Sequence, residues 1–70
     1  MGNTNNAVLD RSKVLLAASA VRSARRPVDS RDIAVALGTT PQTAYRWVIG
    51  AEERGMVTRV TVGRRHFWHV

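Results

Sequence analysis

The sequence predicts a small α+β domain in which three helices are followed by a C-terminal β-hairpin. Three observations indicate this fold class. Apolar residues recur at steps of three and four through most of the chain, as in amphipathic helices. Capping residues, prolines and glycines divide that part into three segments. After Gly55 the composition changes to β-branched and aromatic residues around a central glycine, which is typical of a hairpin.

A first helix is expected from about residue 8 to residue 24, after a flexible N-terminal tail at residues 1–7. It carries one apolar stripe, made by Val14, Ala17, Ala18, Val21 and Ala24. Further leucines widen the apolar surface beyond that stripe: Leu9, Leu15 and Leu16. We favour a single broad buried face; the alternative is that part of this surface contacts a second copy of the chain. Pro27 ends the helix, because proline disfavours helical geometry in the residue before it.

The second helix is expected over about residues 29–37. Asp29 is a good N-cap, and Asp32 stands three residues later, where a capping-box acid belongs. Gly38 stops the helix in the left-handed conformation that glycine adopts readily. The buried side consists of Ile33, Ala34 and Leu37.

The third helix is expected over about residues 41–54, with Thr40 as its cap, Pro41 at its first position and Gly55 after its end. Its core stripe is Ala44, Val48 and Ala51, and the side chains that point elsewhere are Gln42, Tyr45, Arg46 and Ile49. Trp47 flanks the stripe. We expect Trp47 to have a structural role, because burial of so large a ring stabilises a small domain by roughly several kcal/mol.

The hairpin strands are expected at about residues 57–62 and 65–70. Side chains alternate along a strand, so His66, Trp68 and Val70 share one face. The opposite face carries Arg65, Phe67 and His69. We expect the Trp68 face to pack on the helices.

Length and composition argue against several functions. A chain of 70 residues buries only about 60% of its unfolded surface, so we expect no catalytic cleft and no enzyme. It has no cysteine, and its histidines, His66 and His69, have no acidic residue near them in the sequence. We therefore expect no metal and no cofactor, and assign neither histidine to a site. No apolar run approaches the roughly 20 residues of a membrane span.

The charge points to a polyanion. Eleven Lys and Arg residues stand against five Asp and Glu residues, for a formal charge of +6. All the cations except Lys13 are arginines, whose planar guanidinium suits phosphate groups and guanine edges. Nucleic acid is therefore the first partner to consider.

Two short helices joined by a turn with glycine form a helix-turn-helix, and a hairpin after them supplies a wing. The order of "LDR", "RPVDSRDIAVALG", "TTPQTAYR" and "EERGMV" resembles the N-terminal domain of IclR-type transcriptional regulators, and MarR-like and ArsR-like proteins more distantly. The resemblance implies a winged helix that binds double-stranded DNA, usually as a homodimer. The sequence stops at Val70, before the effector domain of full-length family members, so we expect no small-molecule effector. We expect a cytoplasmic protein, nucleoid-associated if it is bacterial or phage-encoded.

In this fold the first two turns of the third helix reach base edges in the major groove. The residues in reach are Gln42, Tyr45 and Arg46. Arg46 can bind guanine and Gln42 can bind adenine, each with two hydrogen bonds, whereas Tyr45 can meet a thymine methyl or a phosphate. The candidates for phosphate contacts are Thr39, Thr40 and Thr43 at the helix N-terminus, together with Arg31 and Arg59. At the hairpin tip, Arg64 and Arg65 match the wing.

We therefore expect a sequence-specific regulator of transcription, or an architectural factor of a phage or mobile element. Two alternatives remain open. The same fold can recognise the shape of Z-DNA or RNA, or it can bind other proteins through the leucine-rich first helix.

Overall fold

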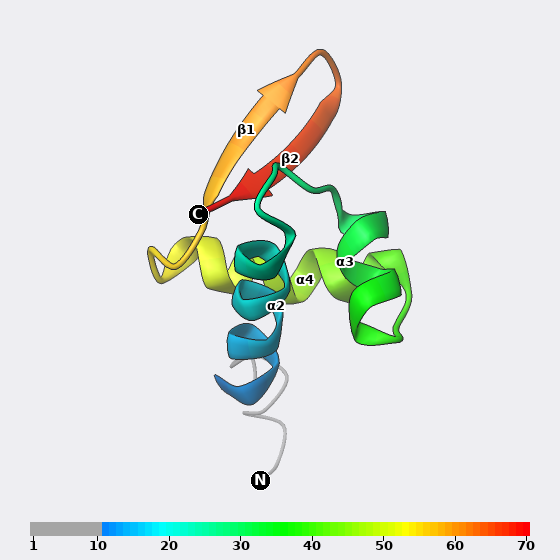
Figure 1. The fold of residues 1–70 in the computed structure, drawn as a ribbon, viewed down its shortest axis with the longest axis vertical. Helices are drawn as coiled ribbons and strands as arrows, with labels where there is room; N and C mark the ends of the chain where they lie inside the picture. The colour runs from blue at the N-terminus through cyan, green and yellow to red at the C-terminus, as the bar shows by residue number, and fades with distance from the viewer. Residues whose placement is uncertain (1–10) are drawn as a thin grey trace, which may run out of the picture.

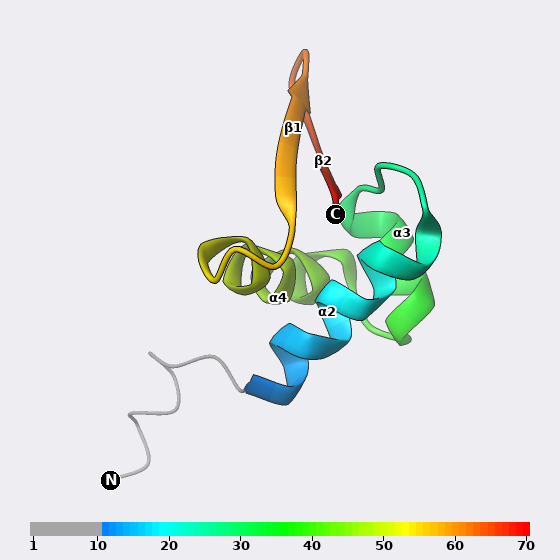
Figure 2. The same cartoon turned by 60° about the vertical axis from the view of Figure 1, so that its left-hand side comes forward.

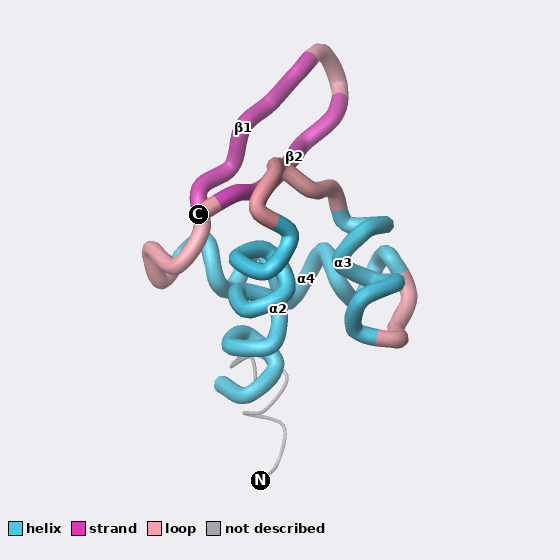
Figure 3. Tube along the Cα trace, in the orientation of Figure 1, coloured by secondary structure: helices cyan, strands magenta, loops and turns pink. Residues whose placement is uncertain are grey.

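The computed structural model describes residues 11–70 (Figure 1). Its elements are α2 (Arg11–Ala24), α3 (Ser30–Leu37), α4 (Pro41–Glu53), β1 (Thr58–Val62) and β2 (Arg65–His69). Three helices followed by an antiparallel hairpin confirm the expected α+β fold class. The tail expected at residues 1–7 and the start of the first helix at residues 8–10 lie outside the described residues. The helices form one body, and the hairpin projects from it (Figures 2 and 3).

Helix α2 buries a narrow stripe. The buried residues are Val14, Ala17, Ala18 and Val21, whereas Ala24, the last member of the expected stripe, is only partly buried. Leu15 and Leu16 are 47% and 49% exposed, so the broad buried face that we favoured is wrong. Each residue turns the helix by about 100°, so these leucines, directly after Val14, point away from the core.

Helix α3 begins and ends where its capping residues predict. The Asp32 N–H donates to Asp29 Oδ1 at 3.0 Å, and the Asp29 N–H donates to Asp32 Oδ2 at 3.3 Å, which completes a capping box. Gly38 ends the helix with a φ of +67°. The chain is thereby turned sharply into α4.

Helix α4 begins at Pro41 after the N-cap Thr40, whose hydroxyl accepts the Thr43 N–H at 3.2 Å. Its last residue is Glu53, one earlier than expected. The end is closed by Gly55, with a φ of +75°, and the amides of Gly55 and Met56 donate to carbonyls of the last turn at 2.9 Å each. The stripe of Ala44, Val48 and Ala51 is fully buried, as expected.

Strands β1 and β2 pair antiparallel, with Arg59 opposite Trp68 and Val62 opposite Arg65. The Val28 N–H donates to the Trp68 carbonyl at 3.0 Å, and the Trp68 N–H donates to the Val28 carbonyl at 2.8 Å. At Trp68, strand β2 therefore pairs with β1 on one edge and with Val28 on the other. Through Val28, the loop before α3 holds the hairpin against the helices. The sequence gives no sign of this pairing, because Val28 stands alone between Pro27 and a helix cap.

Trp68 is 1% exposed and supplies the largest side chain of the core. This burial confirms that its face of the hairpin packs on the helices. Val70, expected on the same face as Trp68, does not pack on the helices: β2 ends at His69, and Val70 is 67% exposed. Trp47 lies at the edge of the core with the Lys13 Nζ 5.2 Å from its ring centroid, which agrees with a structural role. Within residues 11–70, no helix is long and apolar enough to cross a membrane.

Candidate nucleic-acid interface

The outward face of α4 carries Gln42 and Arg46, one helical turn apart and both exposed. The side chains of both residues lack a hydrogen bond or ion pair to any other residue in 11–70. No acidic residue stands in the first turn of α4. Both side chains can therefore turn toward a ligand without losing a partner inside the domain.

Tyr45 lies differently from these two residues. Its ring meets the Trp68 ring edge-on, with centroids 5.8 Å apart and planes at 73°. The side chain is fixed against the hairpin, although the residue remains 39% exposed. Tyr45 thus links the outward face of α4 to the core residue Trp68 and keeps part of its surface open to solvent.

The side chains of Thr40 and Thr43 take part in capping α4, whereas Thr39 contributes a backbone hydrogen bond at the end of α3. The Thr40 hydroxyl accepts the Thr43 N–H and also lies 3.0 Å from the Thr43 hydroxyl. The Thr39 N–H donates to the Ala34 carbonyl at 3.0 Å. Because Pro41 has no N–H, Gln42 contributes the first free amide of the helix. Any phosphate contact at this end would use that amide together with the outer lone pairs of the hydroxyls.

A polar pocket of about 330 Å³ lies between the start of α3, α4 and β2. It brings together three of the residues expected to contact DNA, Arg31, Tyr45 and Arg65, although they lie far apart in the sequence. Its other lining residues are Asp29, Ser30, His66 and Trp68. The pocket offers hydrogen-bond donors from three elements at one place.

Ser30 and His66 are members of this pocket that sequence reasoning missed. Strand alternation placed His66 on the Trp68 face, and that was the signal that could have found it. The His66 Nδ1 is 3.0 Å from the Thr61 hydroxyl on the neighbouring strand. This hydrogen bond leaves Nε2 as the ring nitrogen available to another partner.

Arg65 joins the hairpin to α3. Its Nη2 donates to Asp29 Oδ2 at 2.8 Å, and its guanidinium carbon lies 5.1 Å from the Phe67 ring centroid. The hydrogen bond from the Asp32 N–H is the largest effect on the pKa of Asp29 and lowers it; burial opposes this, and the Arg65 guanidinium lowers the pKa further, so that it stays below its usual value. The Arg65 side chain is 66% exposed, so its other N–H groups still face solvent.

The remaining wing arginines differ in their surroundings. Arg64 stands exposed in the two-residue turn that it forms with Gly63, whose φ is +62°. Arg59 lies lower on the hairpin, with its Nε 3.4 Å from Glu52 Oε2. The other Glu52 oxygen accepts the Trp68 indole N–H at 3.1 Å. Glu52 therefore draws Arg59 toward the base of the hairpin, and Arg64 is the less constrained cation.

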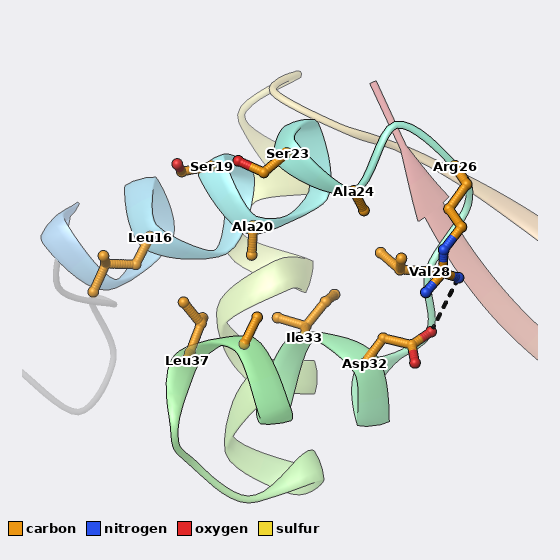
Figure 4. Close-up of a pocket in the computed structure, with 11 residues that line it drawn as sticks. Leu16, Ser19, Ala20, Ser23, Ala24, Arg26, Val28, Asp32, Ile33 and Leu37 are labelled. Atoms are coloured by element: carbon orange, nitrogen blue, oxygen red, sulfur yellow. Dashed lines mark ion pairs between the residues drawn. The ribbon is translucent and has the colours of Figure 1, made fainter.

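A separate groove of about 410 Å³ lies between α2 and α3 (Figure 4). Leu16 and Ala20 line it from α2, and Ile33 and Leu37 line it from α3. An ion pair between Arg26 and Asp32, at 3.7 Å, lies at one end. This groove shares no residue with the polar pocket beside Tyr45.

Among residues 11–70, no three histidine, cysteine or acidic side chains gather as metal ligands would. Comparison with models of known protein families, with curated proteins and with solved structures found no match.

Proposed function

We propose that this protein binds double-stranded DNA in a sequence-specific manner, with α4 in the major groove and the hairpin as a wing. The observation that carries this proposal is the surface formed by the exposed, acid-free first turn of α4 and the pocket at Tyr45, where Arg31 and Arg65 offer donors and the Asp29 carboxylate is paired with Arg65. The order of helices and hairpin is compatible with a winged helix. The resemblance to IclR-type DNA-binding domains supports the same function.

Base recognition is assigned to the outward face of α4. Arg46 binds a guanine through O6 and N7, and Gln42 binds an adenine through N6 and N7. Gln42 and Arg46 are separated by one helical turn, a spacing that matches neighbouring base pairs in the major groove. Tyr45, which is fixed against Trp68, contacts the edge of the site, at a thymine methyl or a phosphate.

Phosphate contacts set the register of the protein on the duplex. Arg31 and Arg65 contact phosphates from the pocket at Tyr45, and Thr39, Thr40 and Thr43 contact phosphate at the start of α4. Arg64 extends the contact at the tip of the wing, and Arg59 contributes near its base. The ion pair with Asp29 ties the Arg65 side chain of the hairpin to the start of α3, next to Arg31.

A single module of this size offers little surface for tight and specific binding. We therefore propose a homodimer on a palindromic site, acting as a small transcriptional regulator or an architectural factor. The exposed Leu15 and Leu16 on α2 are candidates for the dimer contact.

Selection of bound sequences from a random duplex pool tests this proposal. A recurrent sequence with two-fold symmetry is the expected result, because it reports base reading and dimerisation together. Recovery of a random population, or of RNA or Z-forming repeats in parallel selections, would contradict base reading by α4.

The groove between α2 and α3 supports a second candidate function, the binding of another protein through α2. Leu16 lines that groove and is 49% exposed. Salt separates the two functions. DNA binding through phosphates weakens steeply with salt, whereas protein binding through an apolar groove responds little.

A further inference from the structure

Another groove, of about 540 Å³, lies between the C-terminal end of α2 and the hairpin. Apolar side chains line it, including Val21, Val60 and Val70. Val60 pairs with Phe67, next to Trp68 in the strand. Neighbouring residues of a strand point to opposite faces, so this groove lies on the other face of the hairpin from the pocket beside Tyr45.

The rim of this groove is cationic. Arg22, Arg25 and Arg26 line it, and no acidic residue does. Arg26 is paired with Asp32 at 3.7 Å. Within residues 11–70, Arg22 and Arg25 make no hydrogen bond or ion pair through their side chains. Two guanidinium groups are therefore available beside an apolar surface. In that surface, Val60 is 37% exposed and Val70 is 67% exposed.

Arg25 also has an unusual backbone conformation. Its φ is +57°, and it is the one non-glycine residue with positive φ among residues 11–70. Glycine or asparagine normally follows a helix end in this conformation, because a larger side chain is strained there. Strained residues cluster where their side chains have a function. An arginine at this position carries backbone strain that glycine would avoid, and it places a guanidinium on the groove rim.

We propose that this groove binds an acidic peptide segment of a partner protein, in which carboxylates flank bulky apolar side chains. The carboxylates pair with Arg22 and Arg25, and the apolar side chains cover Val60 and Val70. A DNA phosphodiester would satisfy the cations but would leave the apolar floor uncovered, so the chemistry of the groove favours a peptide. Because the groove lies on the opposite face from Tyr45, the peptide leaves the α4 surface open.

A fluorescein-labelled synthetic peptide with two glutamates on each side of Leu-Phe-Leu tests this proposal by fluorescence polarisation. We expect saturable binding that Arg25→Gly and Arg22→Ala each weaken about fivefold, the effect of losing one partly exposed ion pair. Arg25→Gly should melt at or above the temperature of the unchanged protein, because glycine relieves the strain. Reduced binding by a protein of equal or greater stability identifies the guanidinium as the cause.

Arg11→Ala is the matched control, since it removes an exposed arginine from the opposite end of α2. Binding should change little in this variant, and the methyl signals of Val60 and Val70 should shift when the peptide is added. Failure of the peptide to bind, or equal weakening by Arg11→Ala, would overturn the proposal. It would also be overturned if a DNA duplex shifted the same methyl signals and displaced the peptide.

Discussion

The Arg65 guanidinium and the Asp29 carboxylate form an ion pair at 2.8 Å across 36 positions of sequence. Asp29 is at the same time the N-cap of α3, because its other oxygen accepts the Asp32 N–H. One carboxylate thus fixes the start of a helix and the position of the wing. These two effects can be separated by substitution.

Asp29→Asn should destabilise the domain by less than about 1 kcal/mol, because asparagine still caps α3 and the lost ion pair is exposed to solvent on its Arg65 side. Asp29→Ala removes the cap as well, and should cost about 1 to 2 kcal/mol more. Urea unfolding of both variants measures the difference. Equal losses for the two variants would show that the ion pair, and not the cap, dominates.

The pH dependence of stability should report the same carboxylate. The pKa of Asp29 is lowered in the folded protein, so its contribution is present above its unfolded pKa, which is about 3.9. The contribution is lost as the pH falls through the folded value, where both states bind the proton. The difference in unfolding free energy between the unchanged protein and Asp29→Asn should therefore shrink below about pH 4. If the difference in unfolding free energy between the two proteins stayed constant from neutral pH to below about pH 4, the charge of Asp29 would not be its source.

Glu52 offers a test of how the wing is held at its base. Glu52→Ala leaves the indole N–H of Trp68 without an acceptor in a nearly buried position, and should cost about 1 to 3 kcal/mol. Glu52→Gln retains a carbonyl oxygen for the indole and loses the partly exposed contact with Arg59, so its cost should stay below about 1 kcal/mol. Glu53→Ala is the control, since Glu53 is exposed. Thermal unfolding followed by tryptophan fluorescence measures all three.

The sequence was sufficient for features that depend on neighbouring residues. Asp29, Gly38 and Thr40 set the helix ends because caps act over three or four positions. Contacts between distant segments were not predictable in this way. The pairing of Val28 with Trp68 and the ion pair of Arg65 with Asp29 exist only once the hairpin has docked.

The same distinction applies to the candidate site. The exposure of Gln42 and Arg46 follows from the periodicity of α4 and was predicted. The contact of Tyr45 with Trp68 was not, because it depends on where the hairpin lies. Leu15 and Leu16 show the opposite error: their apolar character suggested burial, but among residues 11–70 no element packs closely enough on that side of α2 to bury them.

Arg46→Ala and Arg31→Ala should weaken DNA binding in different ways if α4 reads bases and the pocket holds phosphate. Arg46→Ala should cost about 1 to 3 kcal/mol on the selected site and relax the preference at one base pair. Arg31→Ala should weaken all sequences about equally and reduce the salt slope by about one. Competition titrations with single-base variants of the site, each at two salt concentrations, measure both effects. If Arg46→Ala weakened binding without changing the base preference, Arg46 would contact a phosphate of the DNA backbone and not a base. The sequence specificity would then arise from other residues.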